Sequence, residues 1–220
     1  MTTLAARPEI DTLADLLLRL GSIPPERIAA YPPPGAATEA DLLSPRPEQK
    51  LYELVDGVLV EKAMGYYESF VAMILGYFLE NYLQAHDLGI VLGADGMLKL
   101  APGLVRAPDI SFILWDHFPG GKLVPEPVPN IAPDLAVEVL SAGNTIPEME
   151  RKLREYFAAG SQLVWLVEPK TRTVRVFTSP TEYREFDDTE TLDGGALLPR
   201  FTLSIHEWFS RAARRMPPGY

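Results

Sequence analysis

The chain has 220 residues, 47% hydrophobic and 23% charged, which is typical of one folded domain with a sizeable core. It contains no cysteine, which excludes disulfides and thiolate metal sites. It also has no apolar run of about 18 residues, so we expect a cytoplasmic protein with no membrane partner. The net charge of −10 argues against a large nucleic-acid footprint, because non-specific affinity for phosphates comes mostly from Lys and Arg. A metal site built from carboxylates would account for part of the acidic surplus.

The first 47 residues differ in composition from the rest. Residues 9–20 predict a short amphipathic helix that ends at Gly21. Residues 22–47 are rich in proline and predict an extended arm, whose apolar residues must lie on the core or on a partner subunit. We therefore expect a homodimer or larger homo-oligomer, with an arm over 1–47, a main domain over 48–210 and a loose tail over 211–220.

A hairpin and a long helix open the main domain. Residues 51–55 and 58–61 flank Asp56-Gly57, a pair favoured in two-residue type I′ turns. Glu53 in this hairpin is interpreted as a charge on a strand face. Residues 66–84 predict a helix with an apolar stripe that includes Phe70. Glu68 in its first turn is either an acid favoured by the helix dipole or a third acid directed at a functional site.

Two strands each carry one acid among apolar residues. Residues 90–100 predict two β-segments around a turn, and 104–115 predict a core strand with Asp109 just after Pro108. The Pro- and Gly-rich loop 116–131 is a candidate substrate-contacting loop near these acids. Residues 132–141 predict a fully buried strand with Glu138 in its middle. A buried carboxylate is costly unless it is protonated, paired or bound to a metal.

A helix over 146–159 follows, with a capping box at Thr145 and Glu148, Pro147 in its first turn and Gly160 at its end. Lys152 lies on the side of this helix that faces the core, so it should meet the two acids, or else extend its ammonium to water. Strands are predicted at 162–168, 173–178 and within 181–205, before a last short helix at 206–215. This order indicates the α/β or α+β class, with a mixed sheet and packed helices.

Two carboxylates and a lysine suit phosphodiester hydrolysis. A bound Mg²⁺ or Mn²⁺ neutralises the charge of the transition state and lowers the pKa of a coordinated water. Such hard cations take oxygen ligands and keep several waters. An ammonium beside the metal can stabilise the developing charge. Asp109 and Glu138 are the candidate ligands, while Lys152 and Glu68 complete the candidate site.

Five segments resemble one known family in their order and spacing. The chain resembles the Uma-type restriction endonucleases of the PD-(D/E)xK nuclease superfamily over about residues 48–205. The resemblance implies a restriction-endonuclease-like core of order αβββαβ with extra hairpins. It also implies Asp109 and Glu138 as metal ligands, Lys152 as the catalytic lysine, and nucleic acid, with DNA preferred, as substrate. The segments are YELVDG (52–57), RAPDISF (106–112), APDLAVEVLS (132–141), KLREYFAAG (152–160) and LVWLVEP (163–169).

The chain departs from the resembling pattern at two places, at Leu140 and at Tyr67-Glu68, the latter where many Uma-type sequences carry a histidine, and the roles of the acids have alternatives. Leu140 stands where the pattern has its lysine, and Lys152 is the substitute. Asp109 could be a turn residue, and Glu138 could pair with Arg106 or Arg154. The leading hypothesis is a Mg²⁺-dependent endonuclease. The alternatives are a catalytically degenerate nuclease fold that binds nucleic acid or assists assembly, and a hydrolase of smaller phosphate esters.

Overall fold

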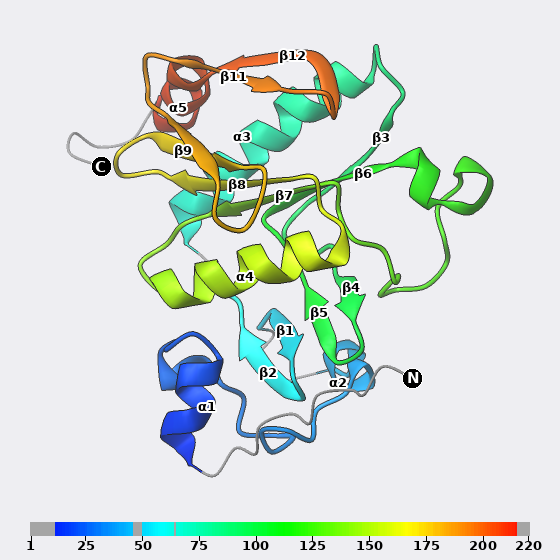
Figure 1. Cartoon of the computed structure of the whole chain (residues 1–220), viewed down its shortest axis with the longest axis vertical. Coiled ribbons are helices and arrows are strands. Elements are labelled where there is room, and N and C mark those ends of the chain that lie inside the picture. Colours follow the sequence, from blue (N-terminus) through cyan, green and yellow to red (C-terminus); the bar gives the residue numbers. More distant parts are fainter. Residues whose placement is uncertain (1–11, 46–49, 64, 215–220) are drawn as a thin grey trace.

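The computed structural model describes residues 12–45, 50–63 and 65–214 (Figure 1). Residues 9–11 and 215–220, on which the ends of the first and last expected helices fall, lie outside the described residues. The helices are α1 (Leu13–Arg19), α2 (Glu39–Leu43), α3 (Tyr66–Leu83), α4 (Ile146–Ala159) and α5 (Ile205–Ala213), with 3₁₀ turns at Pro25–Arg27, Trp115–His117 and Pro119–Gly121. The strands are β1 (Tyr52–Val55), β2 (Val58–Glu61), β3 (Gly89–Leu92), β4 (Leu98–Ala101), β5 (Leu104–Arg106), β6 (Ile110–Leu114), β7 (Leu135–Val139), β8 (Leu163–Glu168), β9 (Thr173–Phe177), β10 (Tyr183–Phe186), β11 (Thr191–Gly194) and β12 (Leu198–Ser204).

A six-stranded mixed sheet forms the centre of the molecule. Its strand order is β10-β9-β8-β7-β6-β3, and β7 and β8 are the parallel neighbours in it. Helix α3 covers one face of this sheet and α4 crosses the other (Figure 1). The chain order α3, β3, β6, β7, α4, β8 is αβββαβ, with β4 and β5 inserted after β3. The expected mixed α/β architecture and its core order are therefore confirmed.

A second, four-stranded sheet lies below the first in Figure 1, with the order β2-β1-β5-β4. The prediction of one strand over 104–115 is wrong, because β5 belongs to this small sheet and β6 to the large one. Pro108 stands between them and has no N–H to continue a ladder. The two β-segments expected over 90–100 exist, but β3 and β4 also belong to different sheets. The chain therefore crosses between the sheets twice in this region.

The loop after β6 lies away from the acids. Asp109 precedes the first residue of β6, whereas the loop 116–131 follows its last residue. The two are therefore at opposite ends of the same strand, and the expected position of this loop beside Asp109 is wrong.

Helix α3 packs on the large sheet through one apolar face. Val71 and Leu75 are fully buried there, as is Leu79. Helix α5 lies against it, where the indole Nε1 of Trp208 donates to the carbonyl oxygen of Val71 at 3.0 Å. Phe70, expected in the buried stripe, is 43% exposed instead. None of the described helices is both long and apolar enough to cross a membrane.

The described part of the N-terminal arm packs on the β1–β2 hairpin of its own chain. Leu16, Leu20 and Ile23 form one buried cluster with Val55 and Val58. The turn of this hairpin is as expected, with positive φ at Asp56 and Gly57. These apolar residues of the arm thus find their surface within the chain, whereas Tyr31 and Leu43 are 77% and 47% exposed. The division of the chain into arm, domain and tail stays a prediction.

Gly57, in the turn of the hairpin, is in close contact with the arm. Its carbonyl oxygen accepts hydrogen bonds from the N–H groups of Gly35 at 2.8 Å and Ala37 at 2.9 Å. A Cβ at Gly57 would lie 2.5 Å from the carbonyl oxygen of Gly35, whereas a Cβ at Gly120 would meet no atom within 4 Å. Both glycines have positive φ, so Gly120→Ala measures the backbone cost alone.

We expect Gly120→Ala to lose about 1 kcal/mol of unfolding free energy, the usual cost of a left-handed residue with a side chain. Gly57→Ala should lose more, by at least about 1 kcal/mol, because the arm must move away. Urea unfolding of both variants measures the difference. Equal losses would contradict the close approach.

Candidate active site

Lys152 is the centre of a cluster of buried charges between the two sheets. Its Nζ lies 2.9 Å from Oε1 of Glu138 on β7 and 3.3 Å from Oε1 of Glu53 on β1. The hydroxyl of Tyr156, one turn further along α4, donates to the same oxygen of Glu138 at 2.5 Å. The Lys152 side chain is 2% exposed, so its ammonium does not extend to water. The predicted contact of Lys152 with Glu138 is present, but its second carboxylate partner is Glu53 and not Asp109.

Asp109 lies beside this cluster and has a lysine of its own. Nζ of Lys62, just after β2, is 2.9 Å from Oδ1 of Asp109, and the N–H of Val139 donates to Oδ2 at 2.7 Å. Ile110 pairs with Val137 in the antiparallel β6–β7 ladder. Asp109 and Glu138 are thus each one residue beyond this pair, at the same end of the sheet. The structure therefore brings the two predicted ligands together.

Arg106 closes the cluster on the side of the small sheet. Its guanidinium lies 2.6 Å from Oε2 of Glu53 and 2.5 Å from Oε2 of Glu155 on α4. The N–H of Ala107 also donates to Glu53, at 3.1 Å. Arg106 therefore pairs with Glu53 and Glu155 rather than with Glu138, which was one alternative. The Glu138 carboxylate uses Lys152 as its cation instead.

The pKa values of the two buried glutamates shift in opposite directions. Burial tends to raise the pKa of Glu53, but Lys152, Arg106 and Lys62 overcome this effect and hold it at about 2. Burial also raises the pKa of Glu138, and the charges of Asp109 and Glu53 add to the rise despite the opposing effect of Lys152. Of these two glutamates, Glu138 therefore has the less complete charge compensation, and another cation nearby would stabilise its ionised form.

A cleft of about 470 Å³ reaches Asp109 from the α3 side of the sheet. Asp109 and Val139 lie in its wall together with Glu68, but Glu138 and Lys152 lie behind this wall and do not line it. The Glu68 carboxylate lies over Gly65 at the start of α3. Within the described chain it makes no hydrogen bond or ion pair with Asp109 or Glu138. Glu68 is thus in the cleft without being part of the charge cluster.

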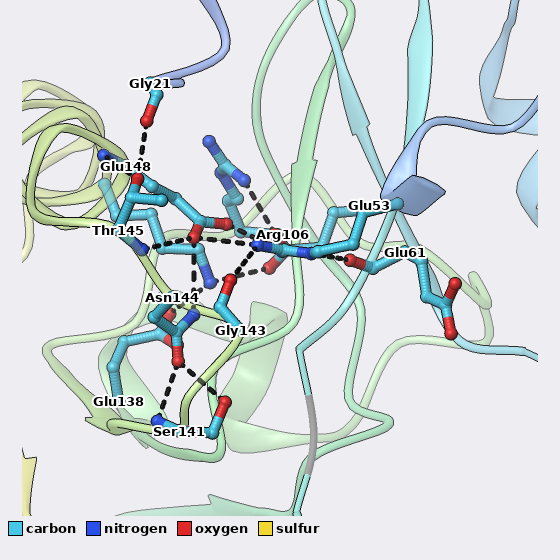
Figure 2. A network of polar contacts seen from close by, with 12 residues as sticks. Gly21, Glu53, Glu61, Arg106, Glu138, Ser141, Gly143, Asn144, Thr145 and Glu148 are labelled. Atoms are coloured by element: carbon cyan, nitrogen blue, oxygen red, sulfur yellow. Dashed lines mark hydrogen bonds and ion pairs between the residues drawn. The ribbon is translucent and has the colours of Figure 1, made fainter. Parts of the chain in front are cut away.

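The N-terminal arm holds the first turn of α4. The guanidinium of Arg27 donates to both carboxylate oxygens of Glu148, at 2.7 and 2.9 Å, and to the carbonyl oxygen of Gly143. The hydroxyl of Thr145 donates to the carbonyl oxygen of Gly21 at 2.5 Å. Figure 2 shows this network beside Glu53 and Arg106. The predicted capping box of Thr145 and Glu148 is confirmed and is shared with the arm.

The acids could hold a small hard cation. Both hydrogen bonds of the Glu138 carboxylate are made by Oε1, which leaves Oε2 without a partner among the described residues. Within the described ranges no three Asp, Glu or His side chains converge as a ready metal cluster. Mg²⁺, however, commonly takes one or two carboxylates and fills its remaining positions with water. Asp109 and Glu138 fit this ligand set.

Sequence reasoning missed Glu53 and Lys62. Glu53 was interpreted as a charge on a strand face, yet it is 1% exposed and all four residues of β1 are buried. The run Tyr-Glu-Leu-Val was a usable signal, because an acid amid apolar residues needs a partner wherever it occurs. Lys62 gave no local signal, since its partner Asp109 is 47 positions further along the chain.

Comparison with known proteins identifies the class of this fold. A crystal structure from Anabaena variabilis ATCC 29413, described as a putative nuclease belonging to DUF820, superposes with a TM-score of 0.68 at 21% identity. The match covers 78% of this chain and 96% of the other, and it shows a shared fold of the restriction-endonuclease-like class. No curated protein matches the chain by sequence.

The family follows from a second comparison. Residues 38–206 match the Uma2 family model, whose description is "Putative restriction endonuclease". The chain belongs to the Uma2 family. The matched range contains Asp109, Glu138, Lys152, Glu53 and Lys62.

Glu53→Gln tests the charge cluster as a stabilising unit. Breaking a buried ion pair typically costs about 3–5 kcal/mol, because the partner charges stay buried. The pKa of Glu53 is about 2 in the folded chain against 4.5 as a free group, so its contribution is present above pH 4.5 and is lost as the pH falls toward 2.

We therefore expect Glu53→Gln to lose about 3 kcal/mol at pH 7, with a smaller loss at pH 3. Glu61→Gln on the adjacent strand is the control. The Glu61 side chain is 27% exposed and pairs with Lys50, so its loss should cost less than about 1 kcal/mol. Denaturant unfolding at both pH values measures this. A pH-independent loss for Glu53→Gln would contradict the assigned charge state.

Proposed function

We propose that this chain is a Mg²⁺-dependent endonuclease, which also accepts Mn²⁺ and hydrolyses phosphodiester bonds of DNA. The observation that carries the proposal is that Asp109, Glu138 and Lys152, from three different segments, lie at the same end of the large sheet, where Asp109 lines a cleft and the other two lie just behind it. Membership of a family whose description is "Putative restriction endonuclease" supports nucleic acid as the substrate. We place the reaction in the cytoplasm, which is compatible with a chain that contains no cysteine.

Each residue has a separate role in this proposal. Asp109 and Glu138 would hold the cation through Oδ1 or Oδ2 and through Oε2. When bound, the cation would supply an acidic water and neutralise charge on the phosphoryl oxygens. The ammonium of Lys152, 2.9 Å from Glu138, favours the ionised carboxylate against burial and repulsion. It also adds positive charge close to the reacting group. Glu68 lines the cleft and would contact water or substrate there.

The position of Lys152 favours an enzyme over a degenerate module. The superfamily pattern has its lysine at the position of Leu140, and the loss of that lysine favours a degenerate module, as does the net charge of −10. In this chain α4 brings Lys152 to the second acid instead. The ammonium therefore stands beside the second acid, where the proposed reaction needs a positive charge.

Cleavage of supercoiled plasmid tests the proposal. The wild-type chain should nick or linearise DNA with Mg²⁺ or Mn²⁺ and should stop when EDTA removes the metal. Asp109→Asn should lower the rate at least a hundredfold, because a ligand charge is lost. Asp116→Asn, in the 3₁₀ turn after β6, should cleave like the wild type. DNA binding without cleavage under all these conditions would favour the module, and cleavage of p-nitrophenyl phosphate alone would favour a smaller substrate.

Lys152→Met keeps the length and apolar packing of the side chain but removes its charge. We expect cleavage to fall by about two or more powers of ten, the range seen when a stabiliser of transition-state charge is lost. Lys99→Met removes a lysine that is paired with Glu39 far along the small sheet, and it should leave cleavage unchanged. Circular dichroism establishes that each variant is folded. Wild-type cleavage by folded Lys152→Met would remove this residue from the site.

We also propose a homodimer that uses the outer face of α3. The arm was the original reason to expect oligomers, but much of it packs on its own chain. Tyr66, Phe70, Met73 and Tyr77 are instead 87, 43, 67 and 49% exposed. Their spacing of four, three and four residues is the a/d repeat with which a helix pairs with another helix. A second copy of α3 offers the same repeat and could pair with it along this face.

Light scattering tests the dimer. The wild-type chain should have twice the 24.4 kDa mass of one chain at micromolar concentration. Met73→Glu should give the monomer, because it places a charge in the proposed seam. Ile146→Glu, which changes an equally exposed apolar residue on α4, should leave the mass unchanged. A wild-type monomer would contradict this proposal.

A further inference from the structure

Lys62 is a buried lysine that the proposed reaction does not use. Its side chain is 2% exposed, and its Nζ lies 2.9 Å from Oδ1 of Asp109. The ammonium also donates to the carbonyl oxygen of Ala94 at 3.2 Å. Asp109 and Ala94 are both in the wall of the 470 Å³ cleft. The ammonium therefore bridges two groups of the cleft wall at the carboxylate that is accessible from the cleft.

We infer that Lys62 is a resident counter-cation of the site, which a divalent cation must displace from Asp109 in order to bind. The inference rests on the proposed metal site and adds the group that controls its affinity. A carboxylate so little exposed needs a positive partner when no metal is bound. A divalent cation would supply that charge itself, and an ammonium left at Oδ1 would repel it.

The contacts of the two lysines distinguish Lys62 from Lys152 in this role. Lys152 lies between Glu138 and Glu53, so a cation that takes charge from Glu138 still leaves Lys152 paired with Glu53. Among the described residues Asp109 is the one carboxylate within ion-pair distance of Lys62. Once a metal occupies Asp109, the ammonium of Lys62 keeps only the carbonyl of Ala94 in its present position. Metal binding at Asp109 would therefore remove the ion pair of Lys62, whereas Lys152 would keep its ion pair with Glu53.

An acid is available on the side to which Lys62 can turn. A second cleft, of about 740 Å³, is lined by Lys62 and Glu68 together with Glu61 and Ser141. Glu68 and Ala63 line both clefts, so the two adjoin at the segment before α3. Glu68 is thus an acid of the adjoining cleft toward which a displaced Lys62 ammonium would turn. Glu68 would thus take part in the site as the acid that receives the displaced ammonium, although it has no contact with Asp109 or Glu138.

Binding of Mn²⁺ in the absence of DNA tests the inference independently of cleavage. Electron paramagnetic resonance of free Mn²⁺ gives the dissociation constant for the whole chain. Lys62→Met should bind Mn²⁺ about tenfold more tightly than the wild type, the order expected when a unit charge is removed several ångströms from a partly buried site. Lys62→Gln, which keeps a donor for Ala94, should also bind more tightly. Lys99→Met makes the same charge change in a distant ion pair and should bind like the wild type.

The outcomes separate this inference from the proposed function. Wild-type binding of Mn²⁺ with equal or weaker binding by both folded Lys62 variants would contradict the counter-cation alone. No binding by the wild type or by any variant would contradict the metal site and the inference together. Unfolding of both Lys62 variants in saturating Mn²⁺ would also contradict the inference, because the bound metal should then supply the positive charge that Lys62 provides to Asp109.

Discussion

The structure depends on the neutralisation of carboxylates that are buried where its two sheets meet. Glu53 comes from the small sheet, Asp109 and Glu138 from the large one, and Lys152 from the helix that crosses between them. Each acid would be strongly destabilising in isolation. Together with Lys62 and Arg106 they form a network in which every cation contacts an acid from another element. The same network that joins the sheets therefore places the candidate catalytic groups.

This arrangement makes α4 the element on which the site depends most. Lys152 and Tyr156 in its middle contact Glu138. Its start is fixed by the arm, because Arg27 donates to Glu148 and the hydroxyl of Thr145 donates to the carbonyl oxygen of Gly21. Arg151 extends these contacts, since its guanidinium donates to Asp56 in the hairpin turn and to the carbonyl oxygen of Arg19. The arm therefore acts on the site by fixing the helix that carries the lysine (Figures 1 and 2).

Local patterns predicted the elements well. The Asp56-Gly57 turn, the capping box of α4 and the buried strand around Glu138 are all present, because each is determined by residues close in sequence. The division of 104–115 into β5 and β6 was missed, because an apolar run in the sequence does not indicate which sheet a strand joins. Pro108, between the two strands, was the available signal. Phe70 was misplaced because the stripe of α3 is apolar beyond the face that packs.

The site could be predicted only in part from the sequence. Asp109, Glu138 and Lys152 could be found because each is conspicuous in its own segment and their segments resemble one family. The contacts of Glu53 and Lys62 depend on how the small sheet meets the large one. Their partners are 47 or more positions away. No periodicity within a strand or a helix contains that information.

The central claim is that Asp109 and Glu138 together bind a divalent cation. A crystal of the wild-type chain soaked in Mn²⁺, with anomalous diffraction data collected for manganese, tests it most directly. The account predicts an anomalous peak between the two carboxylates, at a coordination distance from Asp109 and from Oε2 of Glu138. An ordered site without such a peak, or a peak coordinated by other residues, would contradict it.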